Sequence, residues 1–279
     1  MLYNFRHGGS GAAIYAEGHF IDCIQKTNEW KAYLIDNDIN TLSKALENAF
    51  ITIDAEMREH QESVDTDRSG CTSVTCMITP THIICANAGD SRCVLGRSPS
   101  ETIAMSDDHK PFNESEKRRI ENAGGSVQFK RVDGDLAVSR ALGDFQYKRK
   151  DQIPAEQKVS CVPDINIRDR TPDDDVLLLA CDGLWDVMTN EEATATIRDL
   201  YAAGEDKAVL IAEEMLDCAL NKGSRDNISA IVVKFQGAKV GPASNGGVNH
   251  IREERLKLQQ AQSSNSTEYV SDAAENPEK

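Results

Sequence analysis

The stretch Asp175–Met188, DVLLLACDGLWDVM, joins a run of apolar residues to an abrupt acidic turn. The residues from Leu177 to Cys181 are apolar or small, which predicts a strand that is buried on both faces. Asp182 and Gly183 follow at once, so a carboxylate stands at the end of this strand. An isolated charge there is costly unless it is paired or bound to a cation. An ordinary turn or helix-cap aspartate is the alternative, and the motif alone leaves it open.

Two further aspartates occupy comparable positions. Asp226, in GSRDNIS, precedes the apolar run ISAIVVKF, and Asp108, in MSDDHKP, follows the short run TIAM. Strand-end carboxylates that meet in one cleft form a site for a hard cation such as Mg²⁺ or Mn²⁺. Taken alone, Asp226 also fits a turn or cap, and Asp108 fits a turn whose geometry Pro111 sets.

The rest of the chain divides into helical and strand patterns. Helical spacing of apolar residues predicts helices over 10–26, 40–62, 190–203 and 205–221. In the second of these, one stripe contains Leu42, Ala45, Leu46, Phe50 and Ile53. A further helix is expected after Asn113, with Glu116 at capping-box spacing. Short apolar or β-branched runs predict strands at 73–78, 82–89, 91–96, 126–132, 135–142, 175–182 and 228–235. Antiparallel-type strands with paired helices kept apart indicate an α+β sandwich, with sheets inside and helices outside.

Composition narrows the class of protein. The 279 residues are 39% apolar and 28% charged, and the net charge of −15 argues against a nucleic-acid or membrane partner. The eight cysteines form no Cys-x-x-Cys pair and have no zinc-finger spacing, so we expect reduced thiols. The N-terminus has no secretory pattern. We expect a monomer in the cytoplasm, the nucleus or both.

The composition changes near Gln236, where Gly, Ser, Asn and Gln become frequent. We expect one domain over residues 1–236. Residues 237–279 are expected to form a linker, a short helix at IREERLKLQQAQ and a disordered end. This tail should then be removable without unfolding the domain.

Five motifs follow one another along the chain: GDSRCVL, SDDHKPFNESEKRRIENAGGSV, LAVSRALGDFQYK, ACDGLWDVM and GSRDNIS. In this order and spacing they resemble the metal-dependent protein serine/threonine phosphatases of the type-2C, or PPM, family. The resemblance covers residues 5–235. It implies two central antiparallel β-sheets sandwiched between helices. It also implies hydrolysis of phosphoserine and phosphothreonine in phosphorylated protein partners.

The resemblance assigns roles to individual residues. Asp182 and Asp226 match ligands of a catalytic pair of Mg²⁺ or Mn²⁺ ions, and Asp108 matches a residue that helps Asp182 to hold a third, weaker ion. The two ions would lower the pKa of a shared water and screen the phosphate charge. His7 matches the general acid for the leaving alkoxide. Arg140 lies near the active site in that family, and pairing with a core carboxylate is an equally open interpretation.

The first turn departs from the family pattern, which reads Asp-Gly-His-Gly-Gly. Phe5 and Arg6 precede His7 here, and Phe5 cannot ligate a metal, whereas Arg6 could offer its main-chain carbonyl. We therefore expect a member that lacks the first strands and the bridging aspartate. The alternative to an active phosphatase is a catalytically inactive relative that binds phosphoproteins. A metal-dependent nuclease or sugar phosphatase would fit the carboxylates but not the five motifs.

Overall fold

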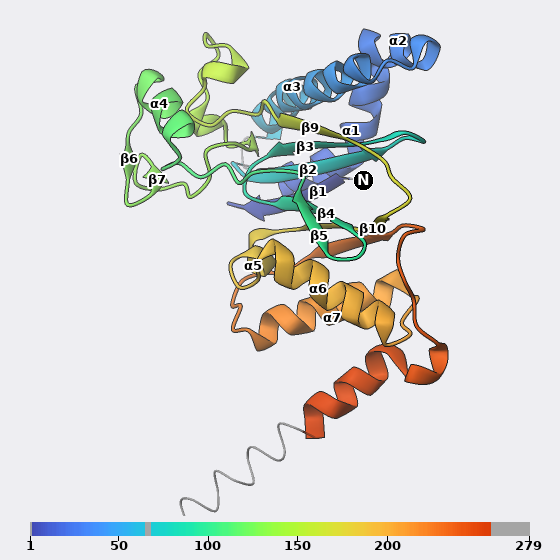
Figure 1. Cartoon of the computed structure of the whole chain (residues 1–279). Helices are drawn as coiled ribbons and strands as arrows, with labels where there is room; N and C mark the ends of the chain where they lie inside the picture. Colours follow the sequence, from blue (N-terminus) through green and yellow to red (C-terminus); the bar gives the residue numbers. More distant parts are fainter. Residues whose placement is uncertain (1, 65–67, 258–279) are drawn as a thin grey trace, which may run out of the picture.

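The computed structural model describes the backbone of residues 2–64 and 68–257, with the side chains of 8–62 and 68–257. Two antiparallel sheets lie face to face in the centre of the molecule, and a layer of helices covers each of them (Figure 1). One layer contains α1 (Gly11–Lys26), α2 (Asn28–Asp36) and α3 (Ile39–Val64). The other contains α6 (Asn190–Ala202) and α7 (Ala208–Asn221). The predicted α+β sandwich is confirmed.

The first sheet lies under α1 and α3. It has the order β1-β2-β3-β9, and β8 pairs with the start of β2. Its strands are β1 (Leu2–His7), β2 (Gly70–Ile78), β3 (His82–Ala88), β8 (Leu142–Gly143) and β9 (Asp164–Asp169). The sequence patterns predicted β2 and β3 but missed β9. This strand lies at the edge of the sheet, and Ile165 and Ile167 alternate in it with polar residues. A period-2 signal was therefore present in the sequence and was overlooked.

The second sheet has the order β11-β10-β4-β5. Its strands are β4 (Arg92–Arg97), β5 (Glu101–Ala104), β10 (Asp174–Ala180) and β11 (Ala230–Lys234). β10 is buried along its whole length, as predicted. Because side chains alternate along a strand, Val176, Leu178 and Ala180 pack in the core that contains residues of α6 and α7. Leu177 and Leu179 enter the core between the two sheets.

The apolar stripe predicted on α3 is confirmed. Its five members are fully buried, and most of them share a core with α1. Within this core the rings of Phe20 and Phe50 meet edge to face, with their centroids 5.1 Å apart. In the described part of the chain, no helix combines the length and the apolar character that crossing a membrane requires.

A lobe beside the sandwich contains α4 (Glu114–Asn122), β6 (Val127–Gln128), β7 (Arg131–Val132) and the short helices Phe145–Tyr147 and Pro154–Glu156 (Figure 1). The capping box predicted at its first helix is wrong. The side chain of Asn113 makes no capping hydrogen bond, and its amide donates to the carbonyl of Asp108 at 2.9 Å. Glu116 is held by Arg119 and Arg140.

The strand predicted over residues 135–142 is also wrong, since only Leu142 lies in a strand, the short β8. Ser139 and Arg140 both hydrogen-bond to the carboxylate of Glu116, which lies 23 and 24 residues earlier in the chain. Tertiary polar contacts therefore set the backbone here, against the local apolar pattern.

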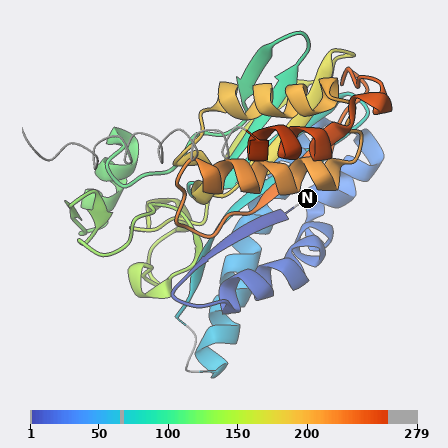
Figure 2. The same ribbon diagram turned by 90° about the horizontal axis from the view of Figure 1, so that it is seen from below.

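The chain continues past β11 into a short helical turn at Ala243–Asn245 and a helix over residues 247–257. This last helix lies beside α7 (Figure 2), and Val248 and Ile251 pack into the core that α6 and α7 share. The predicted division of the chain at residue 236 stays a prediction, and the end of the predicted tail, residues 258–279, lies outside the described residues.

An ion-pair cluster joins this helix to α7. Glu214 on α7 is fully buried, and it accepts hydrogen bonds from Arg252, at 2.9 Å, and from Arg255. A buried carboxylate that loses its cationic partners is strongly destabilising. This contact argues against the expectation that residues 237–279 can be removed without unfolding the domain.

We predict that replacing Arg252 and Arg255 together by alanine lowers the free energy of unfolding by about 3 kcal/mol, because Glu214 is left buried and unpaired. Urea unfolding at pH 7 measures the change. Adding Glu214→Gln to the double variant should restore most of the loss. The control Lys222→Ala, which breaks an exposed pair with Glu192, should change little. A double variant as stable as the parent would contradict the prediction.

Candidate active site

One end of the sandwich, next to α5 (Asp182–Trp185), brings several strand ends together. The antiparallel register places the end of β10 beside the start of β4. The turn between β3 and β4 is tied to the start of β2, because the hydroxyls of Thr72 and Ser91 are 2.8 Å apart. The pairing of His7 with Gly70 brings the end of β1 to the same place. Residues far apart in the sequence can therefore act at one site.

Asp182 lies at this end, directly after β10 and at the first position of α5. Its Oδ1 atom is buried and has no hydrogen-bond partner among the described residues. Burial and the negative charges of Asp90 and Asp226 raise the pKa of Asp182 to about 7. A carboxylate with a free, buried oxygen and acidic neighbours is suited to a hard divalent cation, so this part of the predicted donor set fits the metal.

Gly183 allows Asp226 to approach Asp182. A Cβ atom at Gly183 would lie 2.3 Å from the carbonyl oxygen of Asn227 and 3.4 Å from the Cβ of Asp226, so a larger residue would push this loop away. The hydroxyl of Ser224 donates to the Gly183 carbonyl at 2.6 Å and holds the loop in place. The structure thus brings together the two aspartates that the sequence singled out as main ligands.

Asp90 is a member of this cluster that the sequence analysis did not single out. It is 3% exposed, and burial raises its pKa even though Lys110 Nζ lies 2.5 Å from its Oδ2. Its motif, GDSRCVL, was noted, but no role was assigned. The signal was present, because Asp90 follows the apolar run of β3 just as Asp182 follows that of β10.

Asp108 pairs with an arginine in the structure. Both of its carboxylate oxygens accept hydrogen bonds from the guanidinium of Arg92, at 2.8 and 2.9 Å. Arg92 also donates to Asn190 and lies over the ring of Trp185, 5.0 Å from its centroid. The role of Asp108 as ligand of a third ion stays a prediction, in which each carboxylate oxygen would bind the ion through the lone pair that Arg92 leaves unused.

Arg140 pairs with carboxylates, which was one of the two interpretations left open. Its guanidinium binds Glu116 at 2.9 Å and Asp164 at 2.6 Å. Burial alone would raise the pKa of Glu116, but hydrogen bonds from Arg140 and Ser139 and the charge of Arg119 lower it to about 2. The network therefore stays ionised at neutral pH.

His109 connects this network to the loop that carries Asp108 and Lys110. The N–H of Gly89 donates to its Nδ1 at 3.1 Å, so Nε2 bears the proton and donates to Asp164, also at 3.1 Å. These hydrogen bonds and Arg140 hold the pKa of Asp164 well below its usual range. His109 thus joins this loop to Gly89 through one ring nitrogen and to Asp164 through the other.

The side chains of Arg6 and His7 lie outside the described residues. Their backbone belongs to β1, where Arg6 pairs with Cys71 and His7 with Gly70. The predicted roles of the Arg6 carbonyl as a ligand and of His7 as general acid stay predictions.

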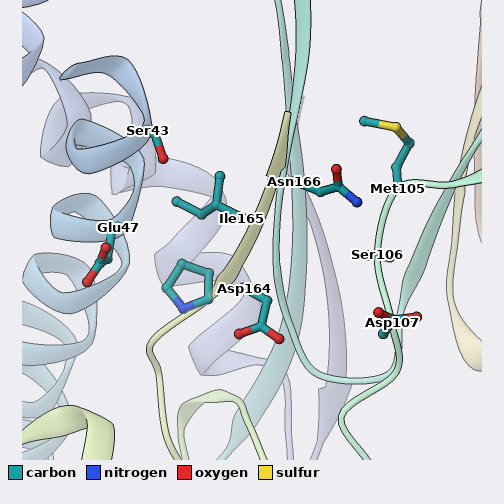
Figure 3. Close-up of a pocket in the computed structure, with 9 residues that line it drawn as sticks. Ser43, Glu47, Met105, Ser106, Asp107, Asp164, Ile165 and Asn166 are labelled. Carbon is teal, nitrogen blue, oxygen red and sulfur yellow. The ribbon is translucent and has the colours of Figure 1, made fainter. Parts of the chain in front are cut away.

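A cavity of about 400 Å³ lies between α3, the start of β9 and the loop after β5 (Figure 3). Carboxylates from all three elements line it, namely Glu47, Asp164 and Asp107. Neither Asp182 nor Asp226 is among its lining residues, so we assign it no part in the candidate active site.

We predict that Mn²⁺ binds to the parent protein more tightly than to Asp182→Asn, because the variant loses a ligand with a free oxygen. Isothermal titration calorimetry of metal-free protein measures both affinities. Since the described residues supply only part of a full ligand shell, binding should be weak. The matched control Asp199→Asn, on the exposed side of α6, should bind like the parent. Identical isotherms for Asp182→Asn and the parent would refute the ligand assignment.

The raised pKa of Asp182 predicts a pH-dependent stability in the metal-free protein. Between about pH 4 and 7 the folded protein holds a proton on Asp182 that the unfolded chain has lost, so the free energy of unfolding falls as the pH rises. Asp182→Asn should remove this contribution. The free energy of unfolding of the variant, relative to that of the parent, should therefore be higher at pH 8 than at pH 5. Urea unfolding at both pH values, with EDTA present, measures the difference. If the free energy of unfolding changes equally between the two pH values in the parent and the variant, the prediction is wrong.

Comparison with known proteins shows the family of the chain. The family model for protein phosphatase 2C matches residues 3–228. The chain is 40% identical over 239 residues to "Protein phosphatase 1B" of Rattus norvegicus, covering 83% of this chain and 61% of the relative. It is 42% identical over 240 residues to "Protein phosphatase 1A" of Homo sapiens, covering 85% and 62%. The chain thus spans about half to three fifths of the length of the curated relatives it matches.

The crystal structure of "serine-threonine phosphatase 2C from Toxoplasma gondii" has the same fold. The TM-score is 0.73 with 25% sequence identity, and the match covers 84% of each chain. The match of the family model over most of the chain and the identity to these relatives lead to one conclusion. The chain belongs to the protein phosphatase 2C family.

Proposed function

We propose that this chain is by function a protein serine/threonine phosphatase with Mg²⁺ or Mn²⁺ ions held by Asp182 and Asp226, and that its first turn limits its turnover. The observation that carries the proposal is the buried Oδ1 of Asp182, which has no partner among the described residues and lies among like charges. A hard divalent cation would relieve this repulsion. The family and the names of the relatives support the reaction class.

Asp182 and Asp226 would supply carboxylate oxygens, and Asp108 would help to hold a third, more weakly bound ion. Two bound cations would activate a water and screen the charge of the phosphate. Lys110 partly neutralises the cluster through its pair with Asp90, which limits the cost of bringing these carboxylates together.

The first turn would complete the site. Arg6 would offer its main-chain carbonyl as a ligand, and His7 would donate a proton to the oxygen of the leaving serine or threonine. The substrates would be phosphorylated proteins. All eight cysteines are free thiols, which supports a reducing compartment, the cytoplasm or the nucleus.

A catalytically inactive protein that binds phosphoproteins is the second candidate. The observation in its favour is the sequence Phe5-Arg6 where the family turn has Asp-Gly. A phenyl ring cannot bridge two cations, so the ligand shell would be incomplete even with Asp182 and Asp226 in place. The two candidates differ in turnover, not in substrate class.

We predict that the chain releases phosphate from a phosphothreonine peptide slowly or not at all in Mn²⁺. Phe5→Asp combined with Arg6→Gly should raise turnover, because a bridging carboxylate is restored. Within that variant, His7→Gln should reduce turnover about a hundredfold through loss of the general acid, and Asp226→Asn should abolish it. Phosphate release measures each step, and Asp199→Asn is the control.

Two outcomes would change the assignment. Rapid Mn²⁺-dependent turnover by the unmodified chain would show that another carboxylate, such as Asp107 or Asp186, takes the bridging position. If the double variant binds the phosphopeptide but releases no more phosphate than its Asp226→Asn derivative, the chain is the inactive binding protein.

A further inference from the structure

Three cysteines converge between the two sheets, away from the aspartate cluster. Cys76 on β2 and Cys85 on β3 face each other directly in the antiparallel register. Cys93 comes from β4 in the opposite sheet, and its sulfur is 3.3 Å from that of Cys76. All three sulfur atoms lie within 4.8 Å of one another. Strands from both sheets therefore present thiols to a single point.

The surroundings of this three-cysteine cluster are dry and apolar. Cys76 is 3% exposed and the other two are fully buried, in a core with Val74 and Leu95. Among the residues that the structure describes, no histidine, carboxylate or further cysteine joins the group. Within the described part of the chain, the cluster thus offers three sulfur ligands and no ligand from a histidine or carboxylate side chain.

Packing alone does not account for this arrangement. A buried cysteine can serve as a small apolar residue, as Cys71 and Cys161 do in the core beneath α1 and α3. Such a role requires burial, but it does not require three sulfur atoms in mutual contact.

We propose that Cys76, Cys85 and Cys93 form a binding site for a soft, three-coordinate metal ion, with Cu(I) as the ion that fits best. Thiolates select soft ions, and Zn²⁺ in structural sites requires a fourth ligand that this core lacks. The hard ions suited to the aspartate cluster prefer oxygen ligands. Each thiol that binds as a thiolate releases its proton to solvent, and no electron is transferred.

The position of the cluster predicts how the ion would enter and what it would do. Because the sulfur atoms are buried, the ion should bind while the sheets assemble, and its binding energy should add to folding stability. It would link β2 and β3 to β4. The site does not depend on phosphatase activity, so it can be tested independently of it.

The test is anaerobic refolding of the full chain with Cu(I) supplied as its glutathione complex, followed by desalting and metal analysis. We expect the parent to retain about one copper ion per chain, with a sulfur-to-copper charge-transfer band and a higher thermal midpoint than the copper-free protein. Cys93→Ala should lose the ion, the band and the shift. The control Cys161→Ala, which removes a buried thiol outside the cluster, should keep all three.

Several results would overturn the proposal. Copper retention by the parent no greater than by Cys93→Ala would show adventitious binding to other thiols, and loss of retention in Cys161→Ala would point to a different site. Retention of Zn²⁺ in preference to Cu(I) would show that the site has a fourth ligand and is not a three-coordinate site for a soft ion. If circular dichroism shows that Cys93→Ala does not refold, Cys85→Val makes the same comparison with better-filled volume, and the same outcomes decide.

Discussion

The antiparallel pairing of β10 with β4 is the constraint on which the rest of the site depends. It aligns the end of β10 with the start of β4, so Asp182 emerges beside the turn that carries Asp90. A slip of one residue would exchange the two faces of β10 and move Leu177 and Leu179 out of the core between the sheets. The hydrophobic pattern of one strand thus fixes the position of the charged cluster at its end.

Like-charge repulsion is the cost of this arrangement. The raised pKa values of Asp182 and Asp90 show that the folded protein holds these carboxylates where ionisation is unfavourable. Lys110 offsets part of the cost, and the apolar cores on both faces of the second sheet supply the stability that tolerates the remainder. A site that is unfavourable without a cation is prepared to bind one.

Several buried carboxylates in the described part of the chain are held by arginines, and three of these pairings illustrate what they do. Glu116 is bound by Arg119 and Arg140 in the lobe, and Asp175 by Arg198 on α6. Glu214 is bound by arginines of the last helix. In each case the guanidinium joins segments that are separate in the sequence or lie in different layers. Such pairs specify which segments dock, because an unpaired buried carboxylate would be costly.

Much of the fold could be predicted from the sequence because the periodicity of apolar residues is a local property. This periodicity was sufficient to predict the buried stripe of α3 and the buried strand β10. The position of a carboxylate next to a buried strand indicated Asp182 and Asp226 as functional residues. The same position, next to a buried strand, also marks Asp90. Its place in the cluster became apparent only from its burial and from the rise that its charge causes in the pKa of Asp182. The strand β9 also carried a local signal, the alternation of Ile165 and Ile167 with polar residues, and this signal was overlooked.

Only the tertiary structure decided which partner each polar residue has. Asp108 binds Arg92 across 16 residues of sequence, and Glu116 holds Arg140 in place of capping its own helix. The three cysteines of the cluster are spread over 18 positions and meet only because two sheets pack face to face. The sequence by itself determined the elements, since apolar spacing acts over a few residues. The partners depend on distances set by the packing of whole layers, and no local pattern encodes those distances.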